Sequence, residues 1–224
     1  YVGRRYDAFF TNIPVGDITK YKSKVEEAVP QLEGQLIIKE FPTGKATIST
    51  IESHVKKCID LDFKPDLILI DYVDLLRSKR KNGERKDEID DIYISTKGLA
   101  RELKLPIWSV SQVNRAGAKD DIIEGDKAAG SYDKMMVTDV AISLSRKRQD
   151  KVNGTGRFHI MKNRYGMDGM TYSVVADTST GHFEVTDHHF DDSDSPAPVQ
   201  QLPGTNLNTL DRDTLAEQFF SLNT

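Results

Sequence analysis

The chain has 224 residues, of which 38% are hydrophobic and 29% are charged, and its formal net charge is −4. This composition is typical of a globular protein and gives no overall basic signature of nucleic-acid binding, so such a role would depend on local basic loops. The single cysteine, Cys58, excludes an intrachain disulfide framework and a cysteine-rich zinc site, and it favours a reducing compartment such as the cytoplasm. No run of residues is long and apolar enough to span a membrane, so we expect no membrane partner.

The first sixty residues predict helices joined by short extended segments. Residues 1–13 have the pattern of a helix end and an exit loop, and residues 18–32 have a charged helical pattern with Asp17 as the candidate N-cap. Residues 36–40 indicate a strand, and residues 41–44 indicate a turn. A second helix follows, because Ile48, Ile51, Val55 and Ile59 keep helical spacing, and the segment from Ser49 to Glu52 has the form of a capping box.

The central feature of the sequence is a run of four aliphatic residues, 67–70, that ends at Asp71. A short continuous apolar run of this kind is typical of a strand in a parallel sheet that is buried on both faces. Asp71 would then lie at the carboxyl edge of the sheet, where open α/β folds bind ligands. The alternative is a core strand that simply ends at a solvated aspartate.

The second half of the chain alternates helix and strand and then turns to hairpins. A basic loop spans 77–86, an apolar helix face is formed by Ile89, Ile92, Tyr93, Leu99 and Leu103, and a strand at 107–111 ends on Gln112. Residues 113–136 are polar and begin without periodicity, and further strands are predicted at 137–144, 157–161, 170–175 and 182–185. We therefore expect an α/β fold with a mainly parallel sheet flanked by helices and antiparallel hairpin strands at its C-terminal edge.

The composition changes after Asp187. Residues 188–206 are acidic and rich in proline and serine, as linkers are, and residues 207–224 form a polar tail punctuated by leucine and phenylalanine. Residues 214–222 could form a short amphipathic helix that docks on a partner, or the whole tail could be disordered. The predicted organisation is one domain at 1–187, a linker at 188–206 and a tail at 207–224.

Five motifs follow one another in the sequence: Asp71-Tyr72 at a strand end, Lys97-Gly-Leu-Ala-Arg-Glu-Leu-Lys-Leu-Pro106, Ser111-Gln-Val-Asn-Arg115, Ala129-Gly-Ser131 and Lys162-Asn-Arg-Tyr-Gly166. In this order they resemble the RecA-type motor domain of DnaB-like replicative helicases. Residues 1–45, with Arg4-Arg-Tyr-Asp-Ala8 and Phe41-Pro-Thr-Gly44, are similar in particular to the replicative helicases of T-even-like phages. The resemblance covers residues 1–185 and implies a RecA-like fold.

One element of that family is missing from these residues. The phosphate-cradling pattern Gly-x-x-x-x-Gly-Lys-Ser/Thr does not occur in the sequence. In the family this loop lies upstream, together with the glutamate that acts as general base, and the chain begins with Tyr1. We therefore expect that residues precede Tyr1 in the natural protein, and that this chain alone binds ATP weakly and hydrolyses it poorly or not at all.

The resemblance assigns roles to particular residues. It implies that Asp71 is the carboxylate on the Mg²⁺ side of bound ATP and that Gln112 senses the γ-phosphate. Asp74, a second carboxylate one helical turn later, stands where the family usually has a neutral polar residue. Lys162 and Arg164 match residues that reach into a neighbouring subunit's nucleotide site. Single-stranded DNA would be held, mainly through its phosphates, by Arg77, Lys79, Arg80, Lys81, Arg115, Lys127, Gly130 and Ser131.

The function implied is that of a hexameric, ATP-dependent replicative helicase in the cytoplasm, or in the host cytoplasm if a phage encodes it. Primase and a helicase loader are the further partners that this implies. Two alternatives stay open. One is a recombinase or regulatory ATPase of the RecA type, which would form filaments and would not unwind forks. The other is a catalytically inactive assembly or DNA-binding module, because the P-loop is absent.

Overall fold

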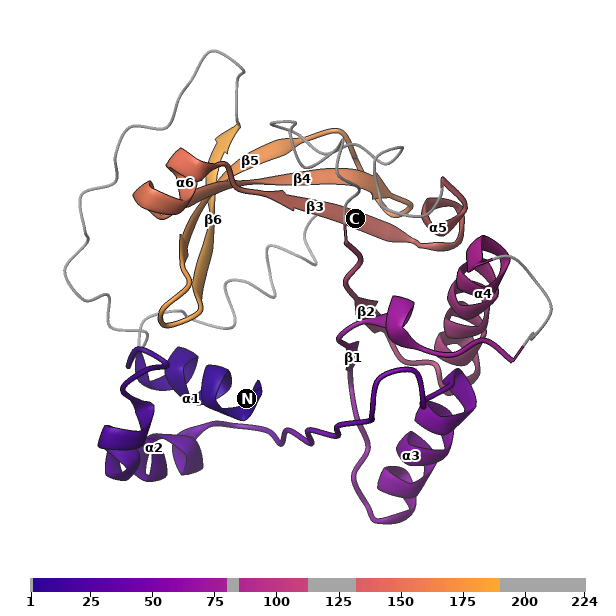
Figure 1. The fold of residues 1–224 in the computed structure, drawn as a ribbon, viewed down its shortest axis with the longest axis horizontal. Coiled ribbons are helices and arrows are strands. Elements are labelled where there is room, and N and C mark those ends of the chain that lie inside the picture. The colour runs from indigo at the N-terminus through magenta and orange to yellow at the C-terminus, as the bar shows by residue number, and fades with distance from the viewer. Residues whose placement is uncertain (1, 80–84, 113–131, 190–224) are drawn as a thin grey trace.

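The structure is a computed structural model that describes residues 2–79, 85–112 and 132–189 (Figure 1). Several expectations fall outside these residues. They concern the linker and tail after residue 189 and six of the predicted DNA-binding residues, namely Arg80, Lys81, Arg115, Lys127, Gly130 and Ser131.

The predicted central strand is present and pairs with the next predicted strand. Strand β1 (Ile68–Ile70) lies parallel to β2 (Ile107–Ser109), with Ile70 opposite Ser109. Helices α3 (Ile48–Asp60) and α4 (Arg85–Leu103) pack on one face of this pair. The core between them is apolar, as the helical spacing predicted, and contains Ala46, Ile48, Ile51, Val55, Val73, Leu76, Ile92 and Leu99.

The opposite face of this parallel pair is open. Successive side chains of a strand point to opposite faces, so Leu69 and Trp108 face away from the helices. Leu67, Leu69, Trp108 and Val110 are 45–59% exposed, and we call these four residues the open sheet face. The expectation of a strand buried on both faces is therefore wrong for the described residues, because α3 and α4 cover one face only.

The late strands form a separate antiparallel sheet of order β3-β4-β5-β6. The strands are β3 (Val140–Ser145), β4 (Thr155–Asn163), β5 (Thr171–Asp177) and β6 (His182–His189). Two short helices were not predicted: α5 (Tyr132–Val137), which takes the residue where β3 was expected to begin, and α6 (Arg148–Asn153) between β3 and β4. The α/β class and the antiparallel hairpins are confirmed, although the parallel part has only two strands in the described residues.

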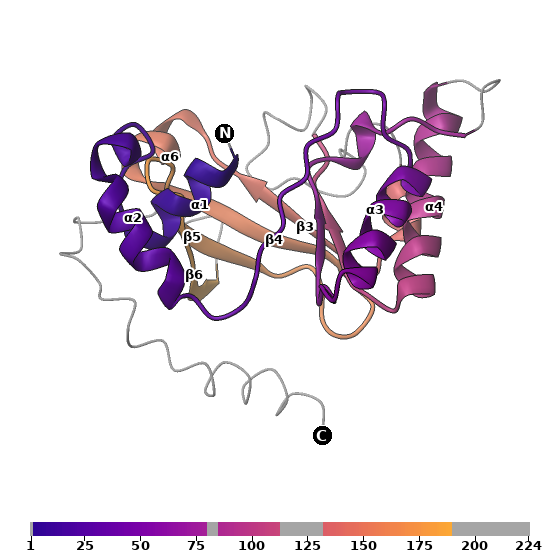
Figure 2. The ribbon, with the colours of Figure 1, turned by 90° about the horizontal axis from the view of Figure 1, so that it is seen from below.

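The N-terminal residues form a helical unit at the far end of the molecule from α3 and α4 (Figures 1 and 2). It consists of α1 (Val2–Thr11), the 3-10 turn η1 (Ile18–Tyr21), α2 (Lys22–Ala28) and a second 3-10 turn, η2 (Val29–Gln31). The Val15 N–H donates to the carbonyl of Ser179, 2.9 Å away in the turn between β5 and β6. Asp17 precedes η1, but its side chain makes no capping bond and instead pairs with Lys20 at 2.7 Å.

The expected strand at 36–40 does not form. These residues cross from the N-terminal helices to α3 as an extended segment without a strand assignment (Figure 1). Leu36, Ile37 and Ile38 are about half exposed. The β-branched sequence favours an extended backbone, but a strand also needs a hydrogen-bonding partner, and the described residues supply none here. The turn that follows is confirmed by the bond from the Lys45 N–H to the Pro42 carbonyl.

The N-cap of α3 differs from the predicted one by two residues. Thr47 caps the helix: its hydroxyl accepts from the Thr50 N–H at 3.2 Å, and the Thr50 hydroxyl accepts from the Thr47 N–H at 3.2 Å. Ser49 lies inside the first turn, so the Ser49–Glu52 capping box is wrong. A threonine hydroxyl replaced the expected glutamate as the reciprocal partner. Within the described residues, no helix has the length and apolarity needed to cross a bilayer.

Candidate functional site

Asp71 and Gln112 lie at the same edge of the parallel pair. Asp71 follows β1 directly, and Gln112 lies three residues beyond β2. Because the two strands are parallel neighbours, their carboxyl ends meet at one edge of the sheet. The Gln112 amide donates to the hydroxyl of Tyr72, the residue after Asp71, at 3.2 Å. The two positions assigned to the nucleotide are thus connected through one side-chain contact.

Ser109 fixes the loop that carries Asp71. Its hydroxyl accepts from the Val73 N–H at 3.0 Å and donates to the Ile70 carbonyl at 2.8 Å. Val73 begins the 3-10 turn η3 (Val73–Leu75), and its side chain is buried in the core. The exposed Asp71 carboxylate is therefore presented from a backbone that is held on both sides.

The Asp74 carboxylate is already paired with other side chains. Its carboxylate pairs with the ammonium of Lys134 at 2.9 Å and accepts from the Ser111 hydroxyl at 2.9 Å. Lys134 also donates to Ser111 at 3.1 Å and lies over the ring of Tyr93, 5.1 Å from its centre. Burial raises the pKa of Tyr93. A carboxylate engaged in this way is a poor metal ligand, so this arrangement favours Asp71 over Asp74 as the metal-side carboxylate.

Lys162 and Arg164 converge on a second cluster, at the junction of α5 and β3. The Lys162 ammonium donates to the carbonyl of Met135 at 2.5 Å and to that of Met136 at 3.3 Å. The Arg164 guanidinium donates to the Met136 carbonyl at 3.2 Å and lies 3.4 Å from the carboxylate of Asp139. The two side chains therefore share a face, as their spacing of two predicted.

Lys97 of α4 completes this cluster by donating to the carboxylate of Asp139. This hydrogen bond, with the charges of Lys97 and Arg164, holds the pKa of Asp139 below its usual value. The pKa of Lys162 is also lowered, first by burial and then by the charge of Arg164. One carboxylate thus faces two cations, and Arg164 is 46% exposed at its side chain, so the cluster presents net positive charge to solvent.

Helix α5 connects the two clusters. Lys134 reaches back from it to the ends of β1 and β2, while the carbonyls of Met135 and Met136 accept from Lys162 and Arg164. The residues predicted to act on a neighbour's site therefore contact α5, and the same short helix contacts Asp74 and Ser111, which are close in sequence to Asp71 and Gln112. Sequence reasoning missed Lys134, Asp139 and this helix, because no periodicity marks so short a segment.

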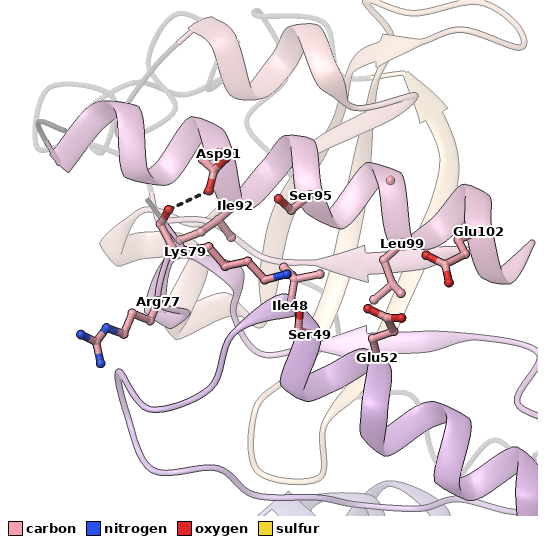
Figure 3. Close-up of a pocket in the computed structure, with 12 residues that line it drawn as sticks. Ile48, Ser49, Glu52, Arg77, Lys79, Asp91, Ile92, Ser95, Leu99 and Glu102 are labelled. Carbon is pink, nitrogen blue, oxygen red and sulfur yellow. Dashed lines mark hydrogen bonds between the residues drawn. The ribbon is translucent and has the colours of Figure 1, made fainter. Parts of the chain in front are cut away.

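The described residues of the predicted basic loop lie elsewhere. Arg77 and Lys79 line a hollow of about 240 Å³ between α3 and α4 (Figure 3). In that view Lys79 extends towards Ile48, and Arg77 points away. The pKa of Glu52, which also lines the hollow, is lowered mainly by Lys56 and to a smaller extent by Lys79. Arg85 begins α4 instead of belonging to the loop, and it donates to the Asp74 carbonyl at 2.9 Å.

The described side chains contain no group of three or more histidine, cysteine, aspartate and glutamate residues that could hold a metal ion by themselves. Magnesium at a phosphate site is commonly bound through one or two carboxylates, with the remaining ligands supplied by phosphates and water. The single carboxylate of Asp71 at the sheet edge fits such a site. It does not fit a metal centre built from protein ligands alone.

Comparisons with known proteins place this chain in a family. A family model described as "DnaB-like helicase C terminal domain" matches residues 9–184. The chain is similar to the DnaB-like replicative helicase of Enterobacteria phage T4, with 24% identity over 73% of the chain and 37% of that protein. It is also similar to a probable plasmid replicative DNA helicase of Chlamydia psittaci, with 29% identity over 54% of the chain and 27% of that protein. The chain thus spans about a third of these relatives.

Solved structures agree on the fold. The solved structure of an ATPase domain is 21% identical in sequence to this chain and matches it with a TM-score of 0.68. The match covers 80% of this chain and 68% of the ATPase domain. A DnaB-like replicative helicase, described with its interactions with primase, shares 21% identity with a TM-score of 0.69, covering 80% of this chain and 46% of its own. At this identity the likeness shows that the α/β fold is shared.

Proposed function

Because the chain belongs to the DnaB-like helicase C-terminal domain family, we propose that it works as part of an ATP-dependent replicative DNA helicase. In the intact protein it would supply the β1–β2 edge of one nucleotide site and the cations that act on the next. ATP hydrolysis would then move the protein along single-stranded DNA and unwind the duplex. The working unit is a homo-oligomer, which we propose to be a hexameric ring.

The observation that carries this proposal is the meeting of Lys162 and Arg164 at the end of α5. Phosphoryl transfer needs positioned phosphates and positive charge against the transition state more than covalent help. A guanidinium suits this task because its fork of donors matches spread phosphate charge. Arg164 is half-exposed, and its guanidinium contacts Met136 and Asp139, so its exposed part can be offered to a neighbouring subunit.

The proposed nucleotide is ATP, bound together with Mg²⁺. The Mg²⁺ ion would neutralise negative charge on the phosphates when bound. Asp71 would hold the metal side, and Gln112 would sense the γ-phosphate and pass the signal through Tyr72. The sequence contains no P-loop, so these residues form only part of a nucleotide site. We therefore propose that the chain alone hydrolyses ATP poorly, and that the intact helicase supplies the rest.

Single-stranded DNA is the proposed track, gripped mainly at its phosphates. The proposed ligands are the eight basic, glycine and serine residues named from the resemblance, of which only Arg77 and Lys79 lie in the described residues. Phosphate contacts give little sequence preference and a strong dependence on salt. Contacts with primase and with a loader are proposed for the intact protein, by analogy with the solved relative whose description includes primase.

The test uses mixed subunits of the intact helicase. Wild-type protein is mixed with increasing fractions of Arg164→Ala, and ATP hydrolysis is followed with single-stranded DNA present. If Arg164 serves a neighbour's site in a coupled ring, activity should fall more steeply than simple dilution. The matched control is Arg148→Ala, an exposed arginine on α6, which should give no loss at any fraction.

Three results would overturn the proposal in different ways. If Arg164→Ala has no effect at any fraction, the arginine has no part in hydrolysis. If the wild-type protein hydrolyses ATP on DNA but fails to displace a strand from a forked duplex, the recombinase or regulatory ATPase alternative is favoured. Absence of any hydrolysis in the intact protein would favour an inactive assembly or DNA-binding module.

A further inference from the structure

Lys134 is a buried cation for which the proposed reaction has no direct use. The residue is 4% exposed, and its ammonium lies between the Asp74 carboxylate, the Ser111 hydroxyl and the ring of Tyr93. A buried charge is costly unless it is paired and hydrogen-bonded, and these partners meet that requirement. The sequence around Lys134 gave no signal of this role, since the residue follows a polar, aperiodic stretch.

The contacts of Lys134 join elements that are far apart in the sequence. Asp74 belongs to the turn after β1, Ser111 follows β2, Tyr93 belongs to α4, and Lys134 itself belongs to α5. Ser111 lies two residues after β2, and Lys134 lies in the first turn of α5. Their hydrogen bond, together with the shared carboxylate of Asp74, ties the start of α5 to the edge that carries Asp71 and Gln112.

The same helix holds the other cluster through its backbone. The residues next to Lys134 in sequence, Met135 and Met136, accept hydrogen bonds from Lys162 and Arg164. If α5 moved while the β1–β2 edge stayed in place, the Asp74–Lys134 pair would break. The pair survives only if α5 and the edge move together. Breaking a buried pair leaves an uncompensated charge, so concerted movement is favoured.

We propose that Lys134 is a positioning residue that makes the β1–β2 edge and α5 move as one unit. This inference rests on the proposed helicase function and deepens it: the pair couples the edge that carries Asp71 and Gln112 to the α5 residues that accept hydrogen bonds from Lys162 and Arg164. Lys134 touches neither nucleotide nor DNA in this role. It acts through Asp74 and Ser111.

The experiment compares variants of the intact helicase. Lys134→Met removes the charge and keeps a similar length, and Asp74→Asn keeps the shape and leaves an acceptor for Ser111. The control is Lys56→Met, which removes a lysine that is also paired with carboxylates, those of Glu52 and Glu102, but is half-exposed. For each variant, the ATP hydrolysis rate is measured with and without single-stranded DNA, and the ratio of the two rates is the readout.

The ratio separates positioning from folding. A purely structural role would reduce the active fraction, lowering both rates by the same factor and leaving the ratio unchanged. Coupling predicts that the ratio falls about tenfold in Lys134→Met and in Asp74→Asn, that the double variant falls no further, and that Lys56→Met keeps the wild-type ratio. An unchanged ratio in Asp74→Asn, the variant least disruptive to folding, overturns the inference.

A second readout does not need hydrolysis. Amide hydrogen exchange is followed with and without single-stranded DNA at Val73, whose N–H is bonded to Ser109, and along α5. In the wild type, DNA should slow amide exchange at Val73 and along α5. In Lys134→Met, DNA should slow exchange along α5 but not at Val73. Slowing at Val73 in both proteins would overturn the coupling while leaving the helicase proposal intact. A wild type that responds to DNA in neither assay would overturn both.

Discussion

Arg164 is attached to Asp139 at two points. Its backbone N–H donates to the Asp139 carbonyl at 2.9 Å, and its guanidinium lies 3.4 Å from the Asp139 carboxylate. The backbone bond fixes where the chain leaves β4, and the side-chain contact fixes the direction of the guanidinium. Lys97 engages the same carboxylate, so Asp139 balances two cations at once.

We expect Asp139→Asn to weaken the proposed action of Arg164 without abolishing it. The backbone bond survives, but Lys97 and Arg164 then face each other without a carboxylate between them. ATP hydrolysis by the intact helicase should fall about tenfold, a loss of about 1.4 kcal/mol in transition-state stabilisation. Arg164→Ala should cost about 10³-fold or more. Steady-state hydrolysis on single-stranded DNA measures both.

The control for this prediction removes the repulsion between Lys97 and Arg164. In the double variant Lys97→Met with Asp139→Asn, both charges of that pair are absent, so part of the lost activity should return. A double variant that is weaker than Asp139→Asn would contradict the electrostatic explanation and assign Lys97 a separate role.

The buried pair of Asp150 and Arg157 should make stability depend on pH. The two charges are 2.6 Å apart, and Asp150 also accepts from the Lys147 N–H at 2.7 Å and from Thr155 at 3.2 Å. Burial by itself raises the pKa of Asp150, but these bonds and the charge of Arg157 together lower it. The stabilisation is therefore present above the unfolded pKa of about 3.9 and is lost as the pH falls through the lower folded value.

Asp150→Asn tests this directly. At pH 7 it should reduce the free energy of unfolding by about 3 kcal/mol, because it leaves Arg157 buried without its partner charge. The difference from the wild type should shrink below pH 4, as urea titrations at pH 7 and pH 3.5 would show. Asp17→Asn, which removes an exposed pair with Lys20, should leave the free energy of unfolding nearly unchanged at both pH values, because solvent screens that pair.

The position of the α3 cap predicts a contrast between two neighbouring hydroxyls. Thr47→Ala removes the acceptor for the Thr50 N–H and should reduce the free energy of unfolding by about 1 kcal/mol. Ser49→Ala lies within the first turn and should change it by less than about 0.5 kcal/mol, since alanine is a better helix former. Equal losses measured by urea denaturation would show that the reciprocal threonine pair does not cap the helix.

Side-chain truncation should reduce stability more in the core that covers one face of the parallel pair than on the open sheet face. Ile92→Ala, at a residue that is 2% exposed in the core, should cost about 2–5 kcal/mol of stability. Leu69→Ala, on the open sheet face, should cost less than about 1 kcal/mol, because its side chain is already 58% in water. Comparable losses by urea denaturation would mean that another part of the chain covers Leu69 in solution.

Local patterns in the sequence were enough to find most elements. Helical spacing located α3 and α4, apolar runs located β1 and β2, and turn residues located the hairpins of the antiparallel sheet. The same patterns placed Asp71 at the end of β1, whereas β2 ends at Ser109, three residues before the predicted end at Gln112. These predictions hold because periodicity and turn chemistry act over a few residues, and the sequence displays them directly.

Contacts between distant segments needed the tertiary structure. The sequence could not show that residues 36–40 lack a strand partner, that Leu69 and Trp108 face water, or that Asp74 is paired with Lys134, which is 60 residues away. Burial and pairing depend on which elements meet, and a local pattern carries no such information. The sequence alone therefore determined the family resemblance and the strands whose ends lie near the candidate residues. The tertiary structure decided that the short helix α5 links the β1–β2 edge to Lys162 and Arg164, because only folding brings the partners of α5 within hydrogen-bonding distance.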